Sequence, residues 1–390
     1  MKTIVSEKTG AAIQRAIDAA SAAGGGKVEL EPGVYLSGTI RLRSNIELHI
    51  PAGAKIQGHD KPELYDDFPH PAGVYPENGK KALLVCADAE NVSVTGKGEI
   101  NGAGPAFYDT NVPPDAFFAK PPHPRPRMVQ FSNCRNVLFE GVSFVDSPGW
   151  TFFLSECEDV AISRIRIDGC QRMINNDGID IDSCKRVAVS DSFFRTGDDC
   201  LILRAIRKNT DKPAICEQVV VTNCVLDSWC QGIRVGCTSD DTIRACRFEN
   251  LVFKGRGSGI HFEYPMRYVR KDDEGYIDVS NISFSHITID SGNHPIRINC
   301  DPEVKPRRIS NISFRDIVIK GRRPIHLIGT PALPLTDITL ENIAGAIADD
   351  TPLVAKYTRR LALDRVNLTA ETGDPVPFVR VPSPSWETHF

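Results

Sequence analysis

The sequence has no apolar run near the roughly 20 residues that a membrane-spanning helix needs, so it predicts no membrane partner. It also has no long basic stripe: 46 lysines and arginines are scattered among 50 acidic residues, and the formal net charge is −4. That balance argues against a nucleic-acid partner. The opening stretch, MKTIVSEKTGAAIQRAIDAASAAGGGKVEL, lacks the apolar core of a signal peptide. We therefore expect a cytoplasmic protein, or a secreted or periplasmic one if a signal peptide has been removed.

Cysteine spacings typical of metal sites are absent as well. Three of the twelve cysteines, Cys134, Cys157 and Cys184, each lie three residues before a valine, and no zinc pattern fits all three contexts. Free buried thiols in a reducing compartment fit the composition better. We expect these cysteines to form a stack of small apolar residues in a repeating fold, and we expect no metal and no cofactor.

What the sequence does contain is a recurring strand-like phrase that opens with a polar residue and continues with valine or isoleucine. It begins at Asn136, Asp159, Arg186, Gln218, Asn281, Asn311 and Asp337. Most neighbouring copies lie 23 to 32 residues apart, and each is rich in β-branched residues followed by turn-forming ones. The leucine pattern of leucine-rich repeats is absent, and propeller blades are longer. The period predicts an all-β fold, a parallel β-helix, with a long outer face suited to an extended polymer.

Two segments depart from this repeat. Residues 10–26 carry apolar side chains at helical spacing and end in a glycine run, which predicts an N-terminal capping helix over the open end of the core. The apolar positions are Ile13, Ala16, Ile17 and Ala20. The proline-rich segment 103–127 is too long for a simple turn, so we expect a loop that forms a wall of a cleft. The prediction is one domain over residues 1–390, ending in C-terminal coils and a tail at 346–390.

Acidic residues gather in two short segments. Asp198 and Asp199 stand together in RTGDDCLIL, and Asp177 precedes Asp198 by 21 residues, about one coil of the repeat. Residues one coil apart lie about 4.8 Å apart, so the three carboxylates can form one cluster in which crowding raises at least one pKa. An acid and a base in one cluster suit glycoside hydrolysis. An exposed turn is the alternative interpretation of GDD alone, and Asp180 and Asp182 are expected to be exposed strand positions.

Two motifs carry a family resemblance. NNDG (Asn175 to Gly178) is similar to N-T-D-G, and GDD (197–199) matches G-D-D, of the polygalacturonase family, glycoside hydrolase family 28. Residues 125–150 also look like that family's approach to its catalytic coils, and the resemblance extends over roughly residues 10–345. It implies a right-handed parallel β-helix and an inverting hydrolase. In that mechanism Asp198 would protonate the leaving oxygen, and Asp177 and Asp199 would hold and deprotonate the water.

The resemblance also implies roles for other residues, and it shows two departures. Asn175 would orient the acid or a sugar hydroxyl. The histidine of the family's G-H-G aligns with Gln231, which cannot carry a proton in catalysis. The R-I-K pair, which in the family binds the galacturonate carboxylate on the leaving-group side, aligns with His261 and Glu263. Since Glu263 would repel a carboxylate, we expect a specificity different from that of ordinary polygalacturonase, such as a neutral sugar like rhamnose.

Further side chains are candidates for binding the substrate. Arg204 and Arg234 could hold a carboxylate through paired hydrogen bonds. An exposed arginine on a strand, with no role in binding, is an equally good interpretation of each. Tyr264 and Trp229 could stack on a sugar ring. We expect a monomer that binds an oligosaccharide or polysaccharide from pectin, with exo action if the long loop closes one end of the groove.

Two other classes of function stay open. Uronate lyases and epimerases also use β-helices, and the three carboxylates could then bind calcium. A non-catalytic glycan-binding β-helix is the other alternative, because the positions of the third and fourth family motifs have changed. The ordered NNDG and GDD motifs favour the hydrolase.

Overall fold

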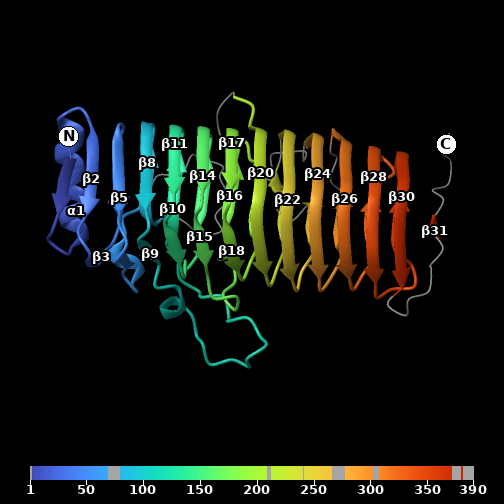
Figure 1. Cartoon of the computed structure of the whole chain (residues 1–390), viewed down its shortest axis with the longest axis horizontal. Coiled ribbons are helices and arrows are strands. Elements are labelled where there is room, and N and C mark those ends of the chain that lie inside the picture. Colours follow the sequence, from blue (N-terminus) through green and yellow to red (C-terminus); the bar gives the residue numbers. More distant parts are fainter. Residues whose placement is uncertain are drawn as a thin grey trace. The chain divides into compact units, whose positions relative to one another are not determined.

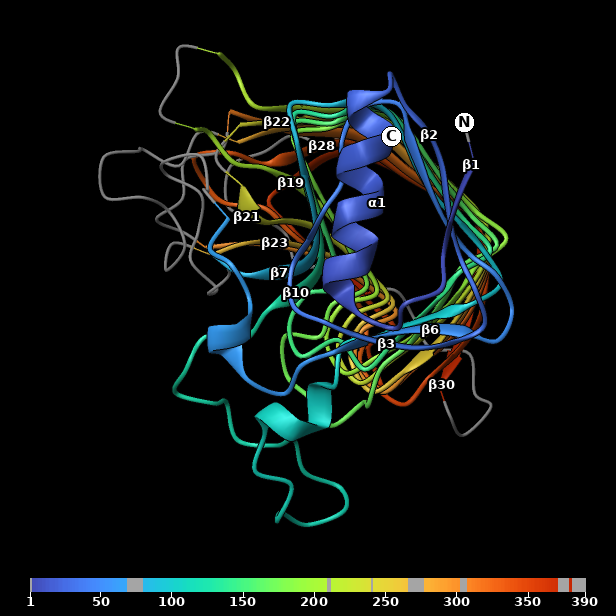
Figure 2. The same ribbon diagram turned by 90° about the vertical axis from the view of Figure 1, so that its left-hand side faces the viewer.

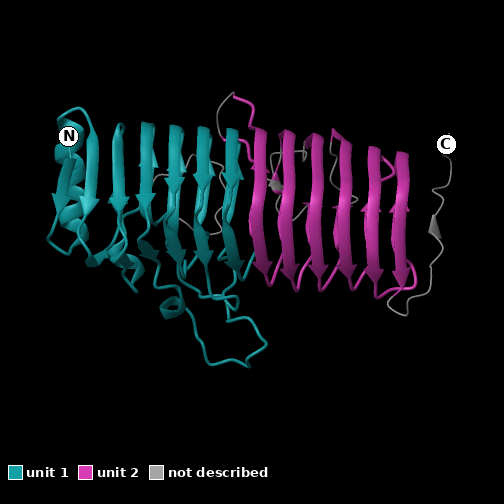
Figure 3. Ribbon diagram, viewed as in Figure 1, with its two compact units in different colours: residues 1–199 teal, residues 200–390 magenta. Residues whose placement is uncertain are grey.

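The structure, a computed structural model, describes residues 2–68, 80–208, 212–239, 241–265, 277–301 and 307–370, and the backbone of 379–380. The chain divides into two compact units, residues 1–199 and 200–390, which Figure 3 shows in different colours. Within the described ranges, no helix is both long and apolar enough to cross a membrane. The single domain expected over residues 1–390 stays a prediction.

Unit 1 begins with strand β1 (Lys2–Val5) and helix α1 (Gly10–Ala22), and its strands form three parallel ladders (Figure 1). The first ladder is β1, β2 (Gly26–Leu30), β5 (Ile46–Ile50), β8 (Glu90–Gly96), β11 (Arg135–Glu140), β14 (Glu158–Ser163) and β17 (Lys185–Ser190). The second is β3 (Gly33–Ser37), β6 (Ala54–Gly58), β9 (Glu99–Asn101), β12 (Ser143–Val145), β15 (Arg166–Asp168) and β18 (Phe193–Thr196). The third is β4 (Ile40–Arg41), β7 (Ala82–Ala87), β10 (Arg127–Ser132), β13 (Phe152–Ser155) and β16 (Ile179–Asp182). Two short 3-10 helices, η1 (Pro62–Leu64) and η2 (Gly104–Phe107), lie in the connections.

In unit 2 one long bent strand in each coil takes the place of the two separate strands that form the first and second ladders of unit 1. Each coil of unit 2 therefore has one long strand and one short strand. The long strands are β20 (Ile215–Ser228), β22 (Thr242–Gly255), β24 (Asp278–Ser291), β26 (Arg308–Gly321), β28 (Leu335–Ile347) and β30 (Thr358–Ala370). The third ladder is β19 (Leu201–Ala205), β21 (Ile233–Ser239), β23 (Ile260–Tyr264), β25 (Ile296–Cys300), β27 (Ile325–Ile328), β29 (Leu353–Lys356) and β31 (Val379–Arg380). The predicted right-handed parallel β-helix is confirmed.

The polar residue that opens each sequence repeat lies at a corner of the coil. All seven of these residues have φ between 53° and 59°, the left-handed region, which asparagine and aspartate tolerate best among residues with a Cβ. Neighbouring corner side chains also bond along the stack. Asn136 Nδ2 donates to Asn91 Oδ1 at 2.7 Å in unit 1, and Asn311 Nδ2 donates to Asn281 Oδ1 at 2.6 Å in unit 2. The repeat in the sequence therefore marks where each coil bends.

Aligned side chains fill the interior of each unit. In unit 2 the ring of Phe284 stacks between those of Phe248 and Phe314, with centroids 4.9 and 5.1 Å away. In unit 1 the predicted stack of cysteines is confirmed: the members are buried, and the Cys157 N–H donates to Cys184 Sγ at 3.3 Å. Such ladders bury apolar surface at every coil, which is the main stabilising contribution in a solenoid.

Helix α1 covers the N-terminal end of unit 1, as the sequence predicts (Figure 2). It buries Ala12, Ile13, Ile17 and Ala20. The side chain of Thr9 caps its first turn by accepting the Ala12 N–H at 3.2 Å. The helix ends at Ala22 rather than at residue 26, because the glycine run that follows adopts positive φ.

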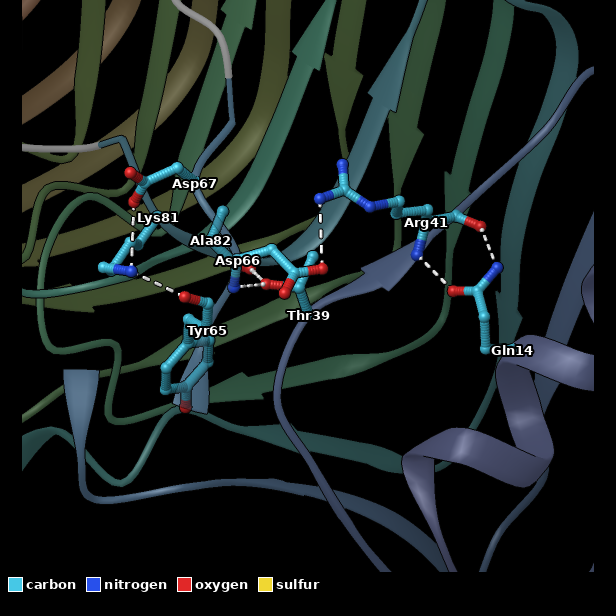
Figure 4. Close-up of polar contacts among 8 residues, drawn as sticks. All are labelled: Gln14, Thr39, Arg41, Tyr65, Asp66, Asp67, Lys81 and Ala82. Carbon is cyan, nitrogen blue, oxygen red and sulfur yellow. Dashed lines mark hydrogen bonds and ion pairs between the residues drawn. The ribbon is translucent and has the colours of Figure 1, made fainter. Parts of the chain in front are cut away.

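Polar contacts tie this end of unit 1 together, as Figure 4 shows. Gln14 of the helix exchanges two hydrogen bonds with the backbone of Arg41, at 2.7 and 3.1 Å. The guanidinium of Arg41 pairs with Asp66 at 3.0 Å, and Lys81 pairs with Asp67 at 3.0 Å. The helix is therefore held to β4 by hydrogen bonds as well as by its apolar face, and the two ion pairs hold residues 66 and 67 against β4 and the start of β7.

The long loop predicted at 103–127 connects β9 to β10 and projects from unit 1 (Figure 1). It holds little regular structure beyond η2, yet its path is tied to the coils. Arg172 donates to three of its carbonyl oxygens at 2.7 to 3.0 Å, and its guanidinium lies 4.6 Å from the centre of the Phe118 ring. The loop is therefore held against the coils of unit 1 by the contacts of Arg172.

Candidate active site

The NNDG and GDD segments lie in neighbouring coils of unit 1. The N–H of Gly178 donates to the carbonyl oxygen of Asp199 at 2.8 Å, and the N–H of Thr151 donates to that of Asp177 at 2.8 Å. Because these two bonds are equivalent, Asp177 and Asp199 occupy matching positions in successive coils. The one-coil relation predicted between the two acidic segments is confirmed. Carboxylate oxygens are also the ligands that Ca²⁺ takes, so a cation would bind here if the lyase alternative held.

The three carboxylates differ in exposure and in how they are held. Asp177 and Asp199 are 3% and 1% exposed, whereas Asp198 is only half-buried. One oxygen of Asp198 accepts the N–H of Asn175 at 3.0 Å, and the other accepts the N–H of Asp199 at 3.0 Å. Asp198 is therefore the most accessible acid of the cluster, with an orientation set by the backbone. Asn175 contacts this acid through its main-chain N–H, whereas its side-chain Oδ1 accepts a hydrogen bond from Arg125, so the predicted role of the side chain stays a prediction.

A buried amide that sequence reasoning missed supports the GDD turn. Asn176 is 1% exposed, and its Oδ1 accepts the N–H groups of Gly197 and Asp198 at 2.7 and 3.1 Å. Its Nδ2 donates to the Cys170 carbonyl oxygen at 2.9 Å. Gly197 is required here, because a Cβ would lie 2.1 Å from the Met173 carbonyl oxygen. The signal in the sequence was the amide inside NNDG itself.

The long loop contributes two more side chains that the sequence did not single out. Arg125 is 4% exposed and donates to Asn175 Oδ1 and to the Ile174 carbonyl oxygen, both at 2.9 Å. It also donates to the hydroxyl of Tyr108. Burial raises the pKa of Tyr108 to about 12, with Arg125 opposing the shift and Asp198 adding to it. These contacts place the loop against the NNDG segment, which agrees with its predicted role as a wall.

The expectation that Asp180 and Asp182 are exposed is wrong, because both are 0% exposed. They do lie on the outer face of β16, but that face is covered in this coil. Asp180 stands in register with Phe153, and the buried guanidinium of Arg127 lies 4.3 Å from the centre of the Phe153 ring. Alternation along a strand predicts the face of a side chain and not what packs over that face.

The remaining predicted site residues belong to unit 2. Gln231 is half-buried, and its Oε1 accepts the Ser258 N–H at 2.7 Å, so the side chain in place of the family's histidine is held by the backbone. Arg204 on β19 is 6% exposed. Tyr264 is 1% exposed, its burial raises its pKa, and a Cβ at Gly236 would lie 2.1 Å from its ring. A ring so enclosed has no open face, so this placement does not favour stacking of Tyr264 on a sugar.

Trp229 has one ring face occupied by an arginine. The guanidinium of Arg256 lies 3.4 Å from the centre of the Trp229 ring, and the indole is half-buried. That leaves one face at most for the predicted contact with a sugar.

The third ladder of unit 2 aligns basic side chains in one outward row. Arg234 is in register with His261, His261 with Arg297, and Arg297 with His326. Arg234 forms an ion pair with Glu263, and the two side chains are 15% and 18% exposed. Glu263 is thus compensated by a neighbouring cation. Sequence reasoning missed Arg297 and His326, although both follow the same proline–isoleucine pair in PIRI and PIHL.

This fold and this site define a class: a parallel β-helix protein with aligned carboxylates in successive coils. The sequence model of glycosyl hydrolases family 28 matches residues 32–212, a range that contains both acidic motifs. This match agrees with the family resemblance that the two acidic motifs carry.

Known proteins that are similar to this chain are named polygalacturonases. A probable polygalacturonase of Arabidopsis thaliana is 27% identical over 224 residues, which are 56% of this chain and 43% of that protein. An endo-polygalacturonase of Pectobacterium carotovorum is 24% identical over 324 residues, 80% of this chain and 77% of that protein. The solved structure of a hyperthermoactive exopolygalacturonase from Thermotoga maritima is similar in fold, with a TM-score of 0.71 at 21% identity over 95% of this chain and 90% of that one. The chain is therefore similar to polygalacturonases in sequence and to an exopolygalacturonase in fold.

Proposed function

We propose that the protein is an inverting glycoside hydrolase that cleaves pectin-related oligosaccharides containing galacturonate or rhamnose. The observation that carries this proposal is the placement of half-buried Asp198 beside Asp177 and Asp199, two carboxylates aligned in consecutive coils. The names of the relatives support a pectic substrate.

In the proposed reaction a water held by Asp177 and Asp199 attacks the anomeric carbon from the face opposite the leaving group. One of these carboxylates takes the proton from the water. The carboxyl of Asp198 gives its proton to the glycosidic oxygen as the C–O bond breaks, so one step inverts the configuration. The acid and the base of such an enzyme are about 6.5–9.5 Å apart, which leaves room for the water. The two backbone N–H bonds to Asp198 would keep its carboxyl aimed during the step.

The leaving-group side is proposed to differ from that of ordinary polygalacturonases. Glu263 and Arg234 neutralise each other, so the pair offers neither the net cation that a carboxylate needs nor a lone repelling charge. Gln231 is held by a backbone N–H, and its amide carries no charge. A neutral sugar such as rhamnose fits these groups, as does a uronate whose charge other cations meet.

We also propose exo action, on the basis of the loop between β9 and β10. Arg172 and Arg125 anchor this loop to its own unit, so it can act as a fixed barrier beside the acidic segments. An exo enzyme releases short products of one size from the first turnovers. A time course by mass spectrometry that shows a broad ladder of intermediate lengths would refute this proposal.

The decisive experiment compares wild type with Asp198→Asn on a panel of pectic and neutral oligosaccharides by mass spectrometry. General acid catalysis contributes on the order of 10²–10⁴-fold, so the variant should lose turnover by that factor while keeping its melting temperature. Asp290→Asn, an exposed strand residue with the same change of charge, is the control and should remain active. Turnover that survives in Asp198→Asn would refute the assignment.

The same samples separate the alternatives. Proton NMR of the first product reports its anomeric configuration, and retention would contradict the inverting mechanism. An unsaturated product that absorbs in the ultraviolet would instead favour a lyase. Tight binding without cleavage would favour the non-catalytic glycan-binding alternative.

A further inference from the structure

The outward row of unit 2 continues beyond His261 and Glu263, the positions that align with the family's R-I-K pair. Strands β23, β25 and β27 align His261, Arg297 and His326, and neighbouring strands are about 4.8 Å apart. The first cation of the row, Arg234, is paired with Glu263. Farther along, Nε of Arg297 is buried and has no hydrogen-bond partner among the described residues. Buried polar groups normally have partners, so this end of the row has bonding capacity left for a ligand.

Two histidines sit at that end. The rings of His294 and His326 stack with centroids 5.1 Å apart and an angle of 17° between their planes. Nδ1 of His294 lies 2.6 Å from the Pro324 carbonyl oxygen, so it carries the hydrogen and donates it. Nδ1 of His326 is buried and, within the ranges that the structure describes, has no hydrogen-bond partner. The pair is half-buried beside Arg297.

Burial, with a smaller contribution from nearby charges, favours the neutral form of both imidazoles. Burial, together with the nearby His294 and Arg297, lowers the pKa of His326 to about 4. Burial likewise lowers the pKa of His294, where the Pro324 carbonyl and Asp349 oppose the effect and Arg297 and Arg323 add to it. An anion bound beside Arg297 and the two histidines would favour the protonated, positively charged form of the imidazoles.

We propose that Arg297 and His326, with His294 packed behind, form an additional subsite for a carboxylate group on a uronate-containing oligosaccharide. The guanidinium offers two parallel donors to the carboxylate, and the imidazole of His326 offers a third. Because the row follows the stacking direction, a sugar chain lying along it presents successive groups to successive coils. The proposal rests on the proposed function for the identity of its ligand as a uronate.

The test measures equilibrium binding in the Asp198→Asn background, where cleavage should not interfere. Tetragalacturonate and its carboxyl-reduced, neutral counterpart are titrated by calorimetry at pH 5.5. Arg297→Gln should weaken binding of the charged oligosaccharide by at least about tenfold and leave that of the neutral one within about twofold. The matched control is Arg315→Gln, which removes the same charge from an exposed side chain of β26 that pairs with Glu341 at 3.1 Å. It should change neither affinity by more than about twofold.

A pH series adds a second readout. Binding of a carboxylate should be accompanied by proton uptake, so the dissociation constant of the parent should rise from pH 5 to pH 7. His326→Gln should show a smaller rise, because its amide donates equally at every pH.

Three results would overturn the subsite: Arg297→Gln behaving like Arg315→Gln, equal affinity of the parent for charged and neutral oligosaccharides, or no binding of either. The proposed function can fail separately. If wild type cleaves nothing, while Arg297 still governs binding of the charged oligosaccharide, the hydrolase proposal falls and the subsite stands.

Discussion

At the scale of single residues, the acid cluster depends on neighbours that carry no charge. The backbone N–H groups of Asn175 and Asp199 set the orientation of Asp198, and the buried amide of Asn176 holds the turn in which Asp198 stands. Motif reasoning finds the acids because their chemistry is visible in the residue type. It does not find a supporting amide, since the role of an amide depends on which N–H groups the fold brings to it.

The amide of Asn176 gives the first prediction. Asn176→Ala should lower the free energy of unfolding by about 1–3 kcal/mol, because it leaves the N–H groups of Gly197 and Asp198 without their acceptor. Turnover should fall as well, since the GDD turn loses its support. Urea denaturation followed by circular dichroism measures the first effect. Asn367→Ala, at an exposed position of β30, is the control and should stay within about 0.5 kcal/mol of wild type. Equal stability of the two variants would contradict the role given to Asn176.

At the scale of elements, each coil is shaped by its corners. The polar residue that opens each repeat takes a left-handed conformation, and its side chain bonds to the equivalent residue of a neighbouring coil where both are asparagine. At such a corner the first residue of the repeat must therefore meet two requirements: it must tolerate a positive φ, and its side chain must donate or accept a hydrogen bond along the stack. Asparagine meets both, which explains its recurrence.

Substitutions at Asn311 separate these two demands. Asn311→Ala should destabilise by about 1–2 kcal/mol, because alanine is strained at φ of 54° and the bond to Asn281 is lost. Asn311→Gly loses the same bond without the strain, so it should be less destabilising than Asn311→Ala by several tenths of a kcal/mol or more. Chemical denaturation of both variants measures the difference. If glycine is as harmful as alanine, strain at this corner is not what selects asparagine.

Strand β27 should make unit 2 sensitive to acid. The pKa of His326 is about 4 in the folded chain, below the usual value of about 6.5, so the folded state binds fewer protons between these two values. Stability from this group is complete above about pH 6.5 and is lost as the pH falls toward 4. In melting curves from pH 7 to pH 4, His326→Gln should therefore lose less stability on acidification than wild type. Parallel losses in both proteins would show that other groups cause the acid sensitivity.

At the scale of the whole molecule, both units repeat one construction: parallel ladders, polar corners and interior rows of aligned side chains. All twelve cysteines are free, and ten of them are buried in these interiors. The fold therefore does not use disulfides, and its stability comes from contacts between adjacent coils.

Thiol labelling tests this construction. In native protein the two partly exposed cysteines, Cys170 and Cys230, should react first with a thiol reagent, and the other ten should react only as the coils open. In denaturant all twelve should react at once. A reductant should leave the melting temperature unchanged. Rapid labelling of most thiols in the native state, or a melting temperature that falls in reductant, would contradict the buried thiol ladders.

The sequence by itself determined the coil period, the β-helix, the helix over its N-terminal end and the two acidic motifs, because each is a pattern of residue types within a short stretch of the chain. Only the tertiary structure decided which side chains are buried and which residues of different coils come into contact. It buried Asp180 and Asp182, brought Arg125 to Asn175, enclosed Tyr264, paired Arg234 with Glu263, and aligned Arg297 with His326. The physical reason is that coil lengths vary, from 23 to 32 residues between recognisable repeats, so the register of one coil on the next cannot be read from spacing. Packing between coils fixes that register, and the register decides which charges meet.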